Sequence, residues 1–157
     1  MIFSCGVQMN AKPTIHIVIE GKPVPNQYVA IRYGKCCIPI RKTRVQKFIK
    51  TVGKAAMMAM IGKQPLEGAI EQRIVFYSRI SKSWSNKKKR EASEGLILPT
   101  SKNNCDLDNV LKTVGDGLSG IVYKDDGQVV ISHAYKKYAD KDYMEIEIVE
   151  LRFDEKS

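Results

Sequence analysis

The sequence predicts a single α/β (α+β) domain in which helices pack on a mixed β-sheet. Segments with the two-residue alternation of a strand lie near both ends of the chain, and segments with helical spacing lie between them. The chain has 157 residues, an ordinary size for one hydrophobic core. We therefore expect one domain over residues 13–153, preceded by a loose N-terminal extension over residues 1–12 whose deletion costs little.

The first half of the domain is expected to begin with two β elements. Residues 13–20 alternate isoleucine with other side chains, which predicts a strand with one buried face. Residues 29–40 are typical of a hairpin that turns at residues 33–35. Pro39 lacks a backbone N–H group and therefore favours an edge position or the end of a strand.

Two segments have the spacing of amphipathic helices. Residues 41–61 form the longer one, with lysines and arginines on the opposite face and Gly62 at its end. Its apolar positions are Val45, Phe48, Ile49, Val52, Ala56 and Met60. Residues 106–119 form the other, with an apolar side that persists despite Gly115 and Gly117.

Three further segments complete the predicted sheet. Residues 69–78 are rich in β-branched and aromatic side chains, which indicates a central strand. Residues 128–138 and 142–151 alternate in the same way after a turn, and we expect them to form an antiparallel pair.

Charge favours a polyanionic partner. The chain has 26 lysines and arginines against 17 acidic residues, a formal net charge of +9. Residues 82–90 concentrate this charge around one tryptophan and the start of a short helix, and we expect them to contact the backbone of DNA. The tryptophan either stacks on an exposed base or anchors the loop to the core. The candidate DNA-binding residues are Lys82, Trp84, Lys87, Lys88, Lys89 and Arg90.

Two other features bear on where the protein works. The four cysteines form no Cys-x-x-Cys pair, so neither a zinc site nor a disulfide framework is indicated, and reduced thiols in the cytoplasm are expected. No apolar run approaches the roughly 20 residues that cross a bilayer, so we expect no membrane partner.

Carboxylates are concentrated around the second predicted helix. Asp106 and Asp108 stand at its start, and Asp125 and Asp126 lie in the turn before the next strand. Carboxylates that share one site repel each other unless a proton or a hard cation such as Mg²⁺ or Mn²⁺ lies between them. Such a cation can bind a phosphate oxygen and activate water, and Lys112, one turn after Asp108, can add a positive charge.

The same residues also have an ordinary structural interpretation. Asp108 is a good helix N-cap, its spacing from Lys112 suits a surface ion pair, and Asp125, Asp126 and Gly127 suit a turn. Spacing alone leaves both interpretations open.

Two sequence strings resemble the signature of the RusA family of Holliday junction resolvases. The first is Asp-Leu-Asp-Asn-Val-Leu-Lys over residues 106–112, and the second is Tyr-Lys-Asp-Asp-Gly-Gln-Val over residues 123–129. The basic segment at residues 81–90 also resembles members carried by phages. The resemblance implies a RusA-like fold and a metal-dependent endodeoxyribonuclease of phage or prophage origin, acting in the bacterial host cell in recombination and repair.

The resemblance also implies a role for each matching residue. Asp106, Asp108 and Asp126 would be the metal-binding catalytic carboxylates, and Lys112 the catalytic lysine. Asp125 matches the first aspartate of the family's pair and would support the metal site. The implied cofactor is Mg²⁺, with Mn²⁺ as a substitute, and the implied substrate is branched DNA, especially four-way junctions.

A four-way junction is resolved by two symmetric nicks, so we expect a homodimer. The apolar side of the helix at residues 106–119 would supply part of the interface or lie wholly in the core, and the sequence does not separate these options. Two competing functions also remain: a basic, non-catalytic architectural DNA-binding protein, and a nuclease for other branched DNA.

Overall fold

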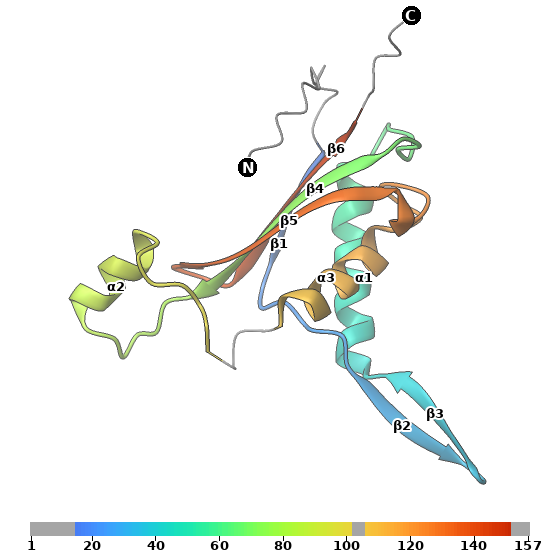
Figure 1. Ribbon diagram of the computed structural model, residues 1–157, viewed down its shortest axis with the longest axis horizontal. Helices are drawn as coiled ribbons and strands as arrows, with labels where there is room; N and C mark the ends of the chain where they lie inside the picture. The colour runs from blue at the N-terminus through green and yellow to red at the C-terminus, as the bar shows by residue number, and fades with distance from the viewer. Residues whose placement is uncertain (1–14, 102–105, 152–157) are drawn as a thin grey trace, which may run out of the picture.

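The main body of the protein is a four-stranded sheet with helices on one face (Figure 1). The computed structural model describes residues 15–101 and 106–151, so the predicted extension at residues 1–12 lies outside the described residues. In spatial order the strands are β1 (Ile15–Glu20), β6 (Tyr143–Glu150), β4 (Ile70–Arg79) and β5 (Val129–Ala139). β4 and β5 run parallel and the other pairs antiparallel, so the predicted mixed sheet is confirmed.

Two helices cover the inner face of this sheet. They are α1 (Thr43–Ala59) and α3 (Leu107–Leu118), which pack against each other and against the strands. Alternate strand residues face the helices, as the pattern of β1 predicts, because successive side chains of a strand point to opposite faces. The centre of the core includes Ile17, Val45, Val52, Ile70, Ile74, Val110, Val114, Leu118, Met144 and Ile146.

The last two strands correct one prediction. β5 and β6 are consecutive in the chain, but they do not pair, because β4 lies between them. β4 is hydrogen-bonded on both edges, and its inner side chains Ile70 and Ile74 are completely buried. The short connection after β5 therefore crosses the end of β4, where Asp142 Oδ1 accepts a hydrogen bond from the Arg79 N–H group at 2.9 Å. The expectation that residues 69–78 form a central strand is confirmed.

The apolar side of α3 belongs to the core of its own chain. Val110, Val114 and Leu118 are buried. At Gly117 the two helices come so close that a Cβ atom placed there would lie 2.6 Å from the Cβ and Cγ1 atoms of Val52. Of the two roles that the sequence allowed for this apolar side, the structure therefore supports the intramolecular one.

Two smaller elements extend from opposite parts of the body (Figure 1). The predicted hairpin forms β2 (Tyr28–Tyr33) and β3 (Cys36–Arg41), which pair with each other as a separate two-stranded sheet and project beside the start of α1. The basic segment forms the short helix α2 (Asn86–Ser93) beyond the ends of β4 and β5. In the described part of the chain, no helix is long and apolar enough to span a membrane.

Candidate active site

The start of α3 presents two carboxylates and a lysine to solvent. Asp106 occupies the N-cap position and Asp108 the first turn, so the alternative that Asp108 is the N-cap is wrong. The Asp106 side chain makes no capping hydrogen bond. The Asp108 side chain is 74% exposed, and its Oδ2 atom lies 4.0 Å from the Nζ atom of Lys112. Because a surface pair of this length contributes little to stability, the fold leaves these carboxylates available for a ligand.

The other aspartates lie in a turn that is held from several sides. Asp125 caps the 3-10 helix η1 (Asp126–Gln128), because its Oδ1 atom accepts a hydrogen bond from the Gly127 N–H group at 2.8 Å. The side-chain oxygen of Gln128 accepts hydrogen bonds from the N–H groups of Lys124 and Asp125. Its Nε2 group donates to the backbone carbonyls of Leu66 and Gly68, just before β4. Asp125 thus has a structural task, whereas Asp126 is exposed at the start of η1.

The two groups of carboxylates lie at opposite ends of α3. Asp106 and Asp108 stand at the start of this 12-residue helix, and η1 follows the turn after its end (Figure 1). At 1.5 Å per residue the helix is about 18 Å long. Among the described residues, no group of three His, Cys, Asp or Glu side chains is close enough to hold one metal ion. A single chain therefore does not bring Asp106, Asp108 and Asp126 together.

The donor set nevertheless fits Mg²⁺. This ion prefers oxygen ligands and is commonly held by one or two carboxylates, with water and substrate phosphate completing its shell. Asp106 and Asp108 are exposed aspartates separated by one residue at a helix start. These two carboxylates could hold such an ion together with a DNA phosphate and water.

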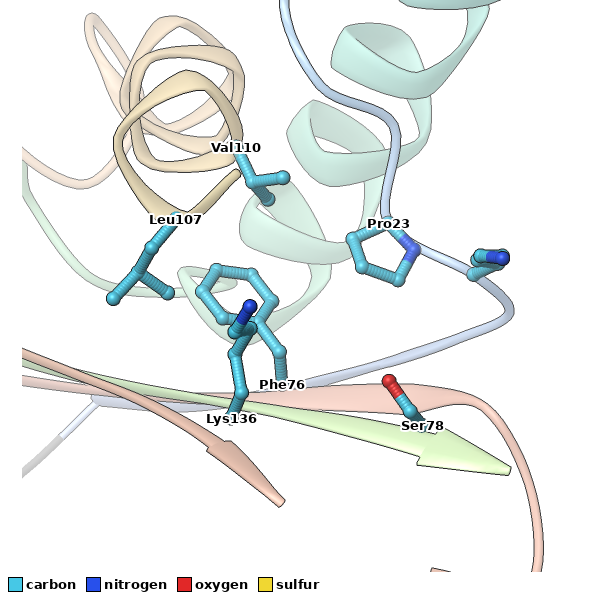
Figure 2. A pocket seen from close by; sticks show the side chains of 7 residues that line it. Pro23, Phe76, Ser78, Leu107, Val110 and Lys136 are labelled. Atoms are coloured by element: carbon cyan, nitrogen blue, oxygen red, sulfur yellow. The ribbon is translucent and has the colours of Figure 1, made fainter. Parts of the chain in front are cut away.

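A small apolar pocket adjoins the start of α3 (Figure 2). Leu107, which separates Asp106 from Asp108, points towards the sheet beside Phe76 of β4, with Val110 above them in this view. The pocket is lined by Lys22, Pro23, Phe76, Ser78, Leu107, Val110 and Lys136. Lys22 and Lys136 thus line the same pocket as Leu107, the residue between the two candidate carboxylates.

The basic segment is anchored to the sheet through its tryptophan. Trp84 is half-buried and makes an edge contact with Tyr138 of β5, with ring centroids 5.2 Å apart. The Nζ atom of Lys88 lies 4.1 Å from the centroid of the Trp84 ring. Of the two roles predicted for Trp84, these contacts support the anchor. The neighbouring groove is lined by Arg79, Ile80, Ser81, Lys82, Lys89, Arg90, Ser93 and Asp140. On α2, the Nζ atom of Lys87 lies 4.0 Å from Oε1 of Glu91.

The comparisons with known proteins agree with these features. The family model described as endodeoxyribonuclease RusA matches residues 20–149. The chain belongs to the RusA family. A protein of Bacillus subtilis (strain 168) named "Uncharacterized protein YqaN" is 32% identical over 141 residues, which cover 87% of this chain and 96% of the relative. RusA proteins are endodeoxyribonucleases that act on Holliday junctions, and the match spans both signature strings of this chain.

Sequence reasoning missed one buried group beside this RusA-type turn. Tyr123 is fully buried, and its hydroxyl has no hydrogen-bond partner among the described residues. Burial, followed by the negative charges of Asp126 and Asp116, raises the pKa of Tyr123 to about 12. The sequence feature that could have drawn attention to Tyr123 was its position in the second signature string, two residues before Asp125.

Replacing Tyr123 with Phe should make the protein more tolerant of alkaline pH. The folded chain keeps the phenol proton up to about pH 12, whereas the unfolded chain releases it near pH 10. The contribution of the Tyr123 phenol to the free energy of unfolding is therefore fully present below pH 10 and is lost as the pH rises towards 12. The loss reaches about 2 kcal/mol at pH 11.5. Urea unfolding of both proteins at pH 9 and pH 11.5 measures this. We expect a smaller loss in Tyr123→Phe, and an equal loss in both proteins would contradict the assigned pKa.

Proposed function

We propose that this RusA-family chain is a Mg²⁺-dependent endonuclease that resolves four-way DNA junctions by paired symmetric nicks, acting as a homodimer in a bacterial cytoplasm. The observation that carries the proposal is the start of α3. There, Asp106 and Asp108 are exposed without a capping task, beside Lys112. Carboxylates placed in this way suit the binding of a divalent cation and a phosphate together.

Each residue of the site has a distinct task in this proposal. Asp106 and Asp108 hold the cation, and Asp126 completes the carboxylate set. The cation supplies a Lewis acid for the phosphate and lowers the pKa of a water molecule. Lys112 places its ammonium group one helical turn from Asp108, where it can offset negative charge that develops on the phosphate during attack. Asp125 supports the site indirectly, because its carboxylate fixes the turn that presents Asp126.

The requirement for two copies has two physical reasons. A junction with two-fold symmetry needs two equivalent cuts, and one chain carries one set of signature carboxylates. In addition, the carboxylates of one chain lie at both ends of α3. A second copy facing the first would bring the start of one α3 near the turn of the other and complete each site.

Positive groups of the pocket at Leu107 and of the groove beside α2 would position the DNA. Lys22 and Lys136 line the pocket next to Leu107, and the groove beside α2 adds Lys82, Lys89 and Arg90. Such contacts neutralise phosphates and carry little sequence information. They suit a substrate that is recognised by shape.

The proposal is tested with wild-type protein and a synthetic four-way junction labelled on each strand in turn. With Mg²⁺ or Mn²⁺ we expect symmetric nicks in one pair of opposite strands on a denaturing gel, and none with chelator. A linear duplex of the same sequence is the control and should remain intact. Binding without cleavage in either metal, with affinity that falls steeply with salt, would instead indicate an architectural DNA-binding protein. Preferred cutting of flaps or forks would indicate another branched substrate.

A further inference from the structure

Glu150, the last residue of β6, carries a carboxylate on the inner side of the sheet, among apolar side chains. It lies opposite Ile70 of β4, and only 9% of its surface is exposed. Among the residues that the structure describes, it is the only acidic one that is buried. A carboxylate withdrawn from water must be hydrogen-bonded or paired, so the bonds of Glu150 indicate what it does.

The Glu150 carboxylate binds the backbone of the connection between α1 and β4. Its Oε1 atom accepts hydrogen bonds from the N–H groups of Glu67, at 3.1 Å, and Gly68, at 2.8 Å. A Cβ atom at Gly68 would lie 3.1 Å from Cγ of Glu150, so the lack of a side chain there lets the carboxylate approach the backbone. Glu150 therefore orients the peptide units on both sides of Glu67.

One of these peptide units is also bound from its other end. The Glu67 N–H group and the Leu66 carbonyl belong to the same planar unit and point in opposite directions. The Nε2 group of Gln128 donates to this carbonyl and to that of Gly68, at 3.0 Å in each case. Glu150 and Gln128 thus bind the Leu66–Glu67 peptide unit from its two sides. Hydrogen bonds joined in this way strengthen each other, because each bond polarises the next group.

The Gln128 side chain also holds the turn that presents Asp126. Its oxygen accepts hydrogen bonds from the N–H groups of Lys124, at 2.8 Å, and Asp125, at 3.0 Å. The amide can face only one way, because reversing it would set its oxygen against two carbonyls and its NH₂ group against two N–H groups. Asp126 is exposed at the start of η1, so the backbone of this turn sets the direction of its carboxylate.

We propose that Glu150 is a positioning residue for Asp126. The Glu150 carboxylate orients the Leu66–Glu67 peptide unit, this unit fixes the Gln128 amide, and the amide fixes the turn. The inference rests on the proposed function for the role of Asp126 as a metal ligand. It adds a residue that lies outside both signature strings.

A surface ion pair joins the same two segments and supplies a matched control. The Nζ atom of Lys124 lies 2.7 Å from Oε1 of Glu67, and the two side chains are 68% and 73% exposed. Such an exposed pair is screened by salt and contributes little. Glu67→Gln removes its charge and leaves the Glu67 N–H group in place, so it separates the surface contact from the buried connection.

The test measures amide hydrogen exchange by NMR in the wild type, Glu150→Ala, Glu150→Gln and Glu67→Gln. In Glu150→Ala, we expect the Lys124 and Asp125 amides to exchange at least about 10-fold faster. This factor should exceed that at Ile74, whose amide reports unfolding of the whole sheet. Glu150→Gln keeps a side-chain oxygen as acceptor and should restore protection of the turn. Glu67→Gln should exchange as the wild type does.

A second measurement connects the turn to the site. Mn²⁺ binding is followed by electron paramagnetic resonance, because supports of metal ligands are commonly worth about 10–100-fold in affinity. We expect the dissociation constant for Mn²⁺ to rise about 10-fold in Glu150→Ala and to recover in Glu150→Gln. Should Glu150→Ala fail to fold, Gln128→Met keeps an unbranched side chain without the amide and breaks the same connection from the side of the turn.

The outcomes separate this inference from the proposed nuclease function. Wild-type exchange at Lys124 and Asp125 in Glu150→Ala, or the same acceleration there as at Ile74, would overturn the inference. So would faster exchange in the turn with an unchanged dissociation constant for Mn²⁺. If the wild type neither binds Mn²⁺ nor nicks a junction, the nuclease proposal fails, and the exchange rates still decide whether Glu150 fixes the turn.

Discussion

Asp108→Asn is expected to abolish junction cleavage, with a loss of at least about 100-fold, while junction binding is retained. The substitution keeps the shape of the side chain and removes the charge that would hold a divalent cation. Asp108 is 74% exposed and its ion pair with Lys112 is long, at 4.0 Å. The free energy of unfolding should therefore change by less than about 0.5 kcal/mol. An effect confined to cleavage would separate a role in catalysis from one in folding.

The measurement is the single-turnover rate of nicking on a labelled four-way junction with Mg²⁺, together with the dissociation constant for the same junction without metal. Glu147→Gln is the matched control, because Glu147 is an exposed carboxylate in the middle of β6. The control should cut at the wild-type rate. Cleavage by Asp108→Asn at that rate would refute the site assignment, and equal losses in both variants would indicate a general effect of charge.

Local pattern was sufficient to predict most elements of the fold. The alternation of Ile15, Ile17 and Ile19 matches the buried and exposed positions of β1, and α2 begins after its cap Ser85, within the basic segment where the sequence predicts the start of a short helix. The pairing of the last strands could not be found in this way. Alternation shows which face of a strand is buried, but not which strand lies beside it, and β4 inserts between β5 and β6 through contacts that are distant in sequence.

The candidate site shows the same division between local and distant information. The exposed carboxylates at the start of α3 follow from a seven-residue string. Asp125 caps η1 through hydrogen bonds that involve Gly127 and Gln128, which lie close to it in sequence. The local sequence therefore contained a capping pattern from which this role could be predicted. The environment of Trp84 could not be predicted, because its charged neighbours suggest exposure while its ring packs on Tyr138, far along the chain.

The two glycines of α3 could be noticed in the sequence, but only the structure distinguishes them. Both have low helix propensity, and both lie within the predicted amphipathic helix. A Cβ atom at Gly115 would meet none of the described residues within 4 Å, whereas one at Gly117 would meet Val52 at 2.6 Å and the Ile49 carbonyl oxygen at 3.0 Å. Gly117 is thus the position that permits α1 and α3 to approach.

Gly117→Ala is expected to lower the free energy of unfolding by about 2–3 kcal/mol, in the range of overpacking substitutions. Val52 is fully buried on α1, so its side chain has no space into which it can move, and the backbone at Ile49 is held in the same helix. The methyl group must therefore push α3 away from α1. Because α3 carries Asp106 and Asp108 at its start, its displacement should also slow junction cleavage at temperatures where the variant remains folded.

Gly115→Ala provides the control within the same helix. It adds the same methyl group in open space, so it should gain up to about 1 kcal/mol of stability from helix propensity. Urea unfolding of the wild type and both variants gives the free energies, and single-turnover cleavage gives the effect on the site. Opposite signs for the two substitutions would show that contact with α1, rather than the presence of alanine in α3, controls stability. Equal effects of both would contradict the close approach of the helices at Gly117.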